Sequence, residues 1–255
     1  MGFNVEGMDA MPACSTQYVT VLALALVCLP LTGCRIASNG QNSMGVRFFQ
    51  QGRFPEALQQ FQTALSKDPS NPEAYYNLAA TYHRIGVSQK DQQLIEQAES
   101  LYNQCLDLAP NHVECHRGLA VLLAESGRPD AAMTLLKNWA ARNPNLSAPR
   151  IELARLHQEF GQPKVAEQYL DEALALNPND YRAWAAKGQM REQAGQLTQA
   201  LQNYQQSLAI NSLQPDLYQR VASLNVRIAQ GGGTEGASGG AWTAGSQPVG
   251  GLRRY

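Results

Sequence analysis

The 255-residue sequence has no large excess of charge of either sign and no recognisable catalytic motif. It carries 20 Lys and Arg against 21 Asp and Glu, a formal net charge of −1 at pH 7. This balance gives no electrostatic footprint for nucleic acid, so we predict no nucleic-acid partner. The chain also lacks a Cys-x-x-Cys pair, a Gly-rich phosphate loop and a nucleophile motif. We therefore expect neither a cofactor nor enzyme activity.

Histidine is scarce, and its four copies do not form a ligand set. His112 and His116 are four residues apart, a spacing that places two ligands on one face of a helix. However, we expect His112 in the turn before that helix, and no second ligand pair completes the site. Structural zinc sites need four protein ligands, so we predict no metal site.

Lysine and arginine are absent from residues 1–34, which hold an apolar run from Tyr18 to Leu31. The run is shorter than the roughly 20 residues of a membrane-spanning helix. Its length suits the apolar core of a secretory signal, although such signals usually begin with a basic residue. The next residues, Leu31-Thr32-Gly33-Cys34, resemble the lipobox of bacterial lipoproteins. The resemblance implies a signal peptide over residues 1–33, lipidation of Cys34 and a short tether over residues 34–37.

Glycines recur along the rest of the chain at intervals of 34, 41, 34 and 34 residues. They are Gly52, Gly86, Gly127, Gly161 and Gly195. A second series, Pro69, Pro110, Pro144, Pro178 and Ser212, follows these glycines in the same order. Within each unit, apolar residues three and four positions apart give every predicted helix one buried stripe. No helix pair can bury its stripe alone, so the units are expected to stack in a one-dimensional array.

The unit resembles the tetratricopeptide repeat (TPR), a 34-residue pair of antiparallel helices called A and B. Leu78-Ala79, Leu119-Ala120 and Leu153-Ala154 match helix A, and triplets such as Ala57-Phe61-Ala64 and Ala166-Leu170-Ala173 match helix B. The resemblance implies an all-α fold, a right-handed α-solenoid of five TPR helix pairs with a C-terminal capping helix. The expected units are 38–71, 72–112, 113–146, 147–180 and 181–214, with the capping helix over 215–230.

Glycine after helix A permits the left-handed φ of a helix C-terminal cap, so the five glycines are expected to end the A helices. The second unit has seven extra residues near 87–93, and we expect its helix B to start early with Ser88 or Asp91 as its cap. In the fifth unit Lys187 and Arg191 occupy positions where the family has Leu and Tyr, which predicts a wetter face there.

Proteins of this family bind partners in a concave groove lined by the A helices. The resemblance therefore implies twelve groove positions: Tyr76, His83, Arg84, Arg117, Val121, Glu125, Ile151, Arg155, Glu159, Arg182, Gln189 and Glu192. They mix both signs of charge with a few apolar groups, which suits a peptide or a helix of a partner protein. An ordinary solvated helix face is the alternative at each position. The chaperone-tail carboxylate clamp is excluded, because Asn42 and Val46 stand where it needs Lys and Asn.

Cys105 and Cys115 fall at the end of one helix B and the start of the next helix A, close together in the repeat register. Two alternatives stay open for them. An exported protein can oxidise the pair to a disulfide, but cysteine is also a good small core residue, which favours two buried thiols.

Residues 231–255 hold nine glycines with Ser, Thr and Ala, a composition that cannot bury a core. We predict a disordered Gly-rich tail. Within it, Trp242 and residues 251–255 are a candidate docking motif, with an ordinary solvated tail as the alternative.

These features together favour a lipid-anchored adaptor of the bacterial cell envelope, facing the periplasm or the exterior. The whole chain is similar to the TPR lipoproteins that assist assembly of pili or secretion channels. A soluble cytoplasmic TPR adaptor with an unprocessed N-terminus is the alternative.

Overall fold

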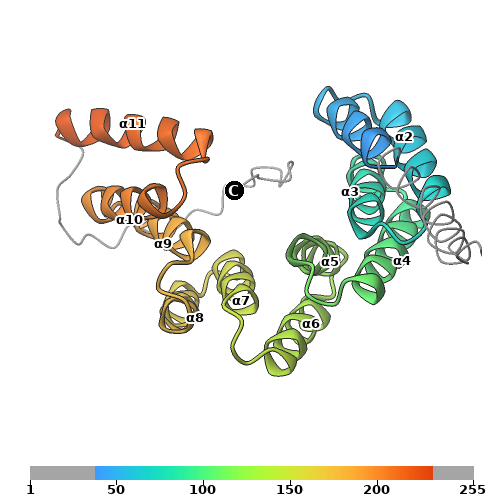
Figure 1. Ribbon diagram of the computed structural model, residues 1–255. Coiled ribbons are helices and arrows are strands. Elements are labelled where there is room, and N and C mark those ends of the chain that lie inside the picture. Colours follow the sequence, from blue (N-terminus) through green and yellow to red (C-terminus); the bar gives the residue numbers. More distant parts are fainter. Residues whose placement is uncertain (1–37, 232–255) are drawn as a thin grey trace, which may run out of the picture. The chain divides into compact units, whose positions relative to one another are not determined.

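The computed structural model describes residues 38–231, whose regular structure is entirely helical (Figure 1). The predicted signal peptide, the lipidated Cys34, the tether and the Gly-rich tail beyond residue 231 lie outside these residues. Within the described range, no helix is both long enough and apolar enough to cross a membrane. The chain divides into two compact units, one ending at Pro110 and the other beginning at Asn111.

The first unit contains four of the described helices. Residues 38–50 are helical, followed by α2 (Phe54–Lys67), α3 (Pro72–Gln89) and α4 (Gln92–Leu108). Its core centres on the buried ring of Phe61, which packs with Ala57 and Leu78. A Cβ at Gly45 would lie 2.5 Å from this ring, so only glycine lets the first helix approach α2 this closely.

The second unit continues the helix pairs to the end of the described residues. Its helices are α5 (Val113–Glu125), α6 (Pro129–Arg142), α7 (Ala148–Glu159), α8 (Pro163–Leu176), α9 (Tyr181–Gln193), α10 (Leu197–Ile210) and α11 (Pro215–Ala229). Each packs on the next in sequence, and α7 also packs on both α5 and α9. The A helices of consecutive repeats are therefore neighbours, and the predicted all-α class of TPR helix pairs is confirmed.

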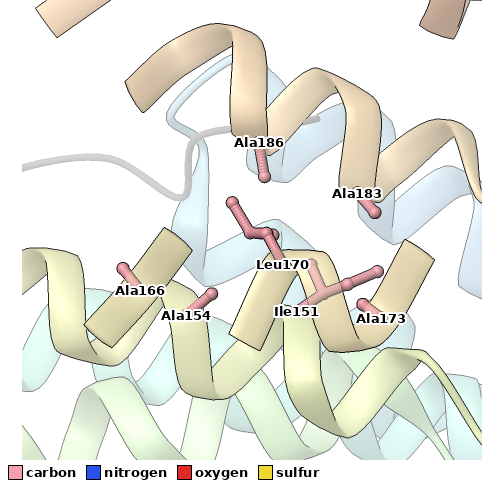
Figure 2. Close-up of a cluster of buried hydrophobic side chains, with 7 residues drawn as sticks. All are labelled: Ile151, Ala154, Ala166, Leu170, Ala173, Ala183 and Ala186. Atoms are coloured by element: carbon pink, nitrogen blue, oxygen red, sulfur yellow. The ribbon is translucent and has the colours of Figure 1, made fainter. Parts of the chain in front are cut away.

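Small side chains allow this close packing. Figure 2 shows Leu170 of α8 between Ala183 and Ala186 of α9 on one side and Ile151 and Ala154 of α7 on the other. Because three of these four neighbours are alanines, three helix backbones come close to a single leucine. At the end of the unit α11 buries Leu217 and Leu224 against α10, as predicted for a capping helix.

Four of the five repeat glycines adopt the predicted left-handed conformation, with φ between 70° and 75°. They are Gly52, Gly127, Gly161 and Gly195, and each follows the end of an A helix. The prediction is wrong for Gly86, which lies inside α3. There a Cβ would be 2.9 Å from Ile95 Cγ1 and 3.1 Å from the Ile95 backbone nitrogen. Gly86 therefore permits close contact between α3 and α4, and Lys90 takes the left-handed position at φ 56°.

The seven extra residues of the second repeat extend both of its helices. Helix α3 has 18 residues and α4 has 17, against 13 and 14 in α5 and α6. Asp91 caps α4 by accepting hydrogen bonds from the backbone N–H groups of Gln93 at 2.9 Å and Leu94 at 3.3 Å. The predicted cap at Asp91 is confirmed. Ser88 instead lies in α3, because the insertion is divided between helix A and helix B rather than added to helix B alone.

Candidate partner-binding face

A buried carboxylate links the first two A helices of the second unit. Glu152 on α7 is 3% exposed and accepts two hydrogen bonds from Arg117 on α5, Nε to Oε2 at 2.9 Å and Nη2 to Oε1 at 2.7 Å. Arg155, one turn along α7, places Nη1 3.9 Å from Oε2. A two-pronged Arg–carboxylate pair fixes the guanidinium plane as well as its position. The Arg117 side chain is therefore held in one orientation.

The charge of Glu152 is maintained by three arginines on three helices. Burial is the largest effect and raises the pKa of this carboxyl. The positive charges of Arg155, Arg117 and Arg182, with the hydrogen bonds from Arg117, outweigh burial and hold the pKa below its ordinary value. Glu152 is thus ionised and responds to the charges of arginines from α5, α7 and α9.

Arg182 is itself positioned by the start of α9. Asp180 caps this helix. Its Oδ2 accepts a hydrogen bond from the Ser147 hydroxyl, Oγ to Oδ2 at 2.6 Å, and lies 3.3 Å from Nη2 of Arg182. Burial raises the pKa of Asp180, but the hydrogen bonds from Ser147 and Arg182 and the arginine charge bring it below its ordinary value. Arg182 is therefore held by Asp180 beside the group formed by Glu152, Arg117 and Arg155.

The opposite ends of α5 and α7 carry acids. Glu125 and Glu159 are the last residues of these helices. Burial, followed by the negative charge of Glu125, raises the pKa of Glu159, while Arg155 opposes the shift. We define the charged face as Arg117, Glu125, Glu152, Arg155, Glu159 and Arg182. Its two exposed acids, Glu125 and Glu159, stand at the helix ends, and its arginines lie nearer the helix starts than these acids do.

Five of the twelve predicted groove positions belong to the charged face: Arg117, Glu125, Arg155, Glu159 and Arg182. Sequence reasoning missed Glu152, because it directly follows the apolar Ile151 and does not itself stand at a groove position of the repeat. Two features could have identified it, namely Arg155 three residues later and Arg117 one repeat earlier.

Two of the predicted positions in this unit do not line such a face. Ile151 is 1% exposed and belongs to the core shared by α7, α8 and α9, so its assignment to the groove is wrong. Glu192 points to other helices: it accepts hydrogen bonds from the Tyr204 hydroxyl at 2.9 Å and from Arg227 at 3.0 Å. It therefore connects α9 to α10 and α11. Val121 and Gln189 are half-buried.

The other three predicted positions are on α3 in the first unit. His83 is buried with its ring edge-on to Tyr102 at 6.3 Å, so its assignment to an open groove is wrong. Tyr76 is half-buried and its ring centre lies 6.2 Å from that of Tyr102. Arg84 is half-buried.

Two ion pairs between α8 and α9 occupy the part of the fifth repeat that was predicted to be exposed or wetter, although both bases are only partly exposed. Lys187 Nζ lies 2.6 Å from Asp171 Oδ1, and Arg191 pairs with Glu167. These bases stand where the family has apolar residues. Their acidic partners are spaced four residues apart on α8, which matches the spacing of the bases on α9.

The cysteine prediction stays a prediction. Cys105 is near the end of α4 in the first unit and Cys115 is near the start of α5 in the second unit. His112 caps α5, with its Nδ1 accepting a hydrogen bond from the Cys115 backbone N–H at 3.2 Å, so it does fall in the turn before that helix as expected. Counting thiols in the unfolded protein with and without reductant distinguishes the disulfide from two free thiols.

Three family models match consecutive parts of the chain. One described as TPR repeat matches residues 45–86, and two described as tetratricopeptide repeat match residues 91–149 and 151–215. Among solved structures, a thermophilic TPR protein of Thermus thermophilus is 25% identical with a TM-score of 0.55. That match covers 74% of this chain and 100% of the other.

Curated relatives match over shorter segments. The human PEX5-related protein is 28% identical over 100 residues, which are 39% of this chain and 15% of the relative. Hsp70-Hsp90 organizing protein 2 of Arabidopsis thaliana is 24% identical over 105 residues, or 41% of this chain and 17% of the relative. The chain spans about a sixth of the length of the curated relatives it matches.

Proposed function

Because the chain belongs to the tetratricopeptide repeat family, we propose that it is a non-catalytic scaffold that binds a peptide or a helix of a partner protein. The TPR fold supports a protein–protein interaction scaffold. In this proposal the partner contacts the charged face of α5, α7 and α9.

The buried Glu152 with its three arginines is the observation that carries this proposal. A buried ion pair contributes little net stability compared with well-packed apolar residues, so folding alone gives little reason to retain it. The arrangement does hold polar groups of three consecutive repeats in fixed positions. Groups that are already ordered lose little entropy when a partner binds, and this favours recognition.

A charge reversal at Arg155 tests the proposal. Arg155→Glu retains both members of the two-pronged pair between Arg117 and Glu152 but inverts the charge beside it, so circular dichroism first checks that the variant is as helical as the wild type. We expect the amount of partner recovered with the full chain from its own cells to fall about tenfold or more, since like charges across an interface are strongly unfavourable. The measurement is quantitative mass spectrometry of proteins that co-purify with each variant.

Arg142→Glu is the matched control, because Arg142 is exposed in the last turn of the B helix α6. It should recover as much partner as the wild type. If Arg155→Glu recovers the same proteins in the same amounts, the charged face is not the binding surface.

We further propose that lipidated Cys34 anchors the scaffold to a bacterial membrane, facing the periplasm or the exterior. The Leu31-Thr32-Gly33-Cys34 motif supports this proposal. Cys34 precedes the first described helical residue, Ser38, by four positions, so at about 3.5 Å per residue the repeats would begin within about 14 Å of the anchor. Fractionation of wild type and Cys34→Ala tests it. A wild type found only in the soluble fraction would favour the alternative, a soluble cytoplasmic TPR adaptor.

Within the envelope, we propose a role in assembling a pilus or a secretion channel, by resemblance to TPR lipoproteins of that kind. The evidence that supports it is the combination of a lipobox and TPR repeats in one short chain. The test is whether a pilus or secretion-channel subunit co-purifies with the detergent-extracted protein and is lost in Arg155→Glu. Recovery of cytoplasmic partners alone would contradict this role.

A further inference from the structure

The charged face has two ends of opposite sign, and its helices run in the same direction. At one end Arg117 of α5 meets Glu152 of α7, and at the other end the charge of Glu125 acts on Glu159. Gln158 of α7 donates a hydrogen bond to Gln193 of α9 at 2.5 Å, which aligns the ends of these two helices as well. The basic groups and the acidic groups therefore lie at matching heights on adjacent helices.

The separation of the two ends follows from helix geometry. Arg155 and Glu159 are four residues apart on α7, and Arg117 and Glu125 are eight apart on α5. At a rise of 1.5 Å per residue the basic and acidic groups are about 6 to 12 Å apart. A chain in extended conformation advances about 3.4 Å per residue, so two to four of its residues cover that distance.

The polar character of the face favours an extended ligand over a helix. An amphipathic helix needs a groove of apolar side chains for its own apolar stripe. Here Ile151 is in the core and Val121 is half-buried, while arginine and glutamate side chains make up the face. Such side chains can hydrogen-bond to the main chain of an extended peptide, whereas the main chain of a helix is already hydrogen-bonded internally.

We propose that the occupant of the charged face is an extended peptide segment carrying one acidic and one basic side chain two to four residues apart. The acidic side chain binds at Arg117, Arg155 and Arg182, whose guanidinium groups each carry five N–H donors. The basic side chain binds at Glu125 and Glu159. This inference rests on the proposed function, since it specifies the chemistry of the partner segment at the same surface.

Selection from a phage library of random twelve-residue peptides on the immobilised full chain tests the pairing. We expect enriched peptides to carry an Asp or Glu and a Lys or Arg at a separation of two to four residues. In Arg155→Gln the preference for the acid should disappear while that for the base remains, and in Glu159→Gln the reverse should hold. For one enriched peptide, each substitution should weaken binding about tenfold in fluorescence anisotropy.

Arg142→Gln on α6 and Glu172→Gln on α8 are matched controls, because both side chains are exposed on B helices. They should leave the selected sequences and the affinity unchanged, and circular dichroism should show all four variants to be equally helical. Enriched peptides that bind this face but lack the charge pair, or carry the two charges seven residues apart, would overturn the inference. The proposed scaffold function would still hold in that case. Absence of any enriched peptide sensitive to Arg155 would count against the proposed function itself.

Discussion

Arg117 and Glu152 are 35 residues apart in the chain, yet two hydrogen bonds of 2.9 and 2.7 Å join them across α5 and α7. The pair connects two consecutive repeats through side chains of which one is fully buried. Replacing either residue of the pair therefore affects the other.

Removing only one member of this pair should destabilise the fold. Arg117→Leu leaves the Glu152 carboxylate buried with less compensation, and we expect a loss of about 2 to 3 kcal/mol in the free energy of unfolding. Urea denaturation followed by circular dichroism measures it. The double variant Arg117→Leu, Glu152→Leu should recover most of the loss, because two apolar side chains need no counter-charge. A single variant that costs under about 0.5 kcal/mol would contradict the proposed importance of the pair.

Stability should decline at acidic pH partly through Glu152. Since its pKa in the folded state lies below the ordinary value of 4.5, the ionised form stabilises the fold above pH 4.5. This contribution is lost as the pH falls from 4.5 through the lowered folded-state pKa. Glu152→Gln should therefore show a shallower loss of stability below pH 4.5 than the wild type in urea titrations at several pH values. Parallel curves for the two proteins would show that another group causes the decline.

Gly188 in α9 should tolerate no larger residue, because a Cβ there would lie 2.5 Å from Cδ1 of the Tyr204 ring. We expect Gly188→Ala to cost about 1 to 3 kcal/mol through overpacking, which lowers the midpoint of thermal unfolding. Tyr204→Leu makes room at the same place, so Gly188→Ala should cost clearly less in that background than in the wild type. Equal costs in both backgrounds would place the strain elsewhere.

The α8–α9 ion pairs should be replaceable by apolar residues. Lys187 and Arg191 lie at positions that TPR sequences usually fill with Leu and Tyr, and both are only partly exposed. We expect Lys187→Leu with Arg191→Tyr to leave the free energy of unfolding within about 1 kcal/mol of the wild type or to raise it. Raising NaCl from roughly 0.05 to 1 M should lower the melting temperature of the wild type, because salt screens partly exposed ion pairs. The variant should show a smaller decrease. A large loss of stability would show that the pairs are essential to the contact between α8 and α9.

The sequence was sufficient to predict the helix pairs, because glycine and proline recur in phase and each has a local conformational cause. It failed at Gly86, where the seven-residue insertion moved the end of helix A to Lys90 and gave the glycine a packing role. Local spacing cannot show how an insertion is divided between two helices, since that depends on where their side chains meet.

The site was predicted less well than the fold. Periodicity places a residue on a helix face only to within part of a turn. This error was enough to select Ile151, which is in the core, and to miss its neighbour Glu152, which binds Arg117. The direction of Glu192 was also beyond prediction, because it depends on Tyr204 and Arg227 from two other helices. Long-range side-chain pairs of this kind carry no signature in one sequence.

The lengthened second repeat has a practical consequence. Helix α3 exceeds α5 by five residues, so at 1.5 Å per residue it is about 7.5 Å longer. Its last residues and the start of the following turn, from Val87 to Lys90, are exposed throughout. A fluorescent label or a short peptide tag inserted at Lys90 would therefore sit at the tip of this helical hairpin, away from the buried contacts of α3 and α4. Such a labelled chain would allow the protein to be followed in cells while the charged face keeps its native sequence.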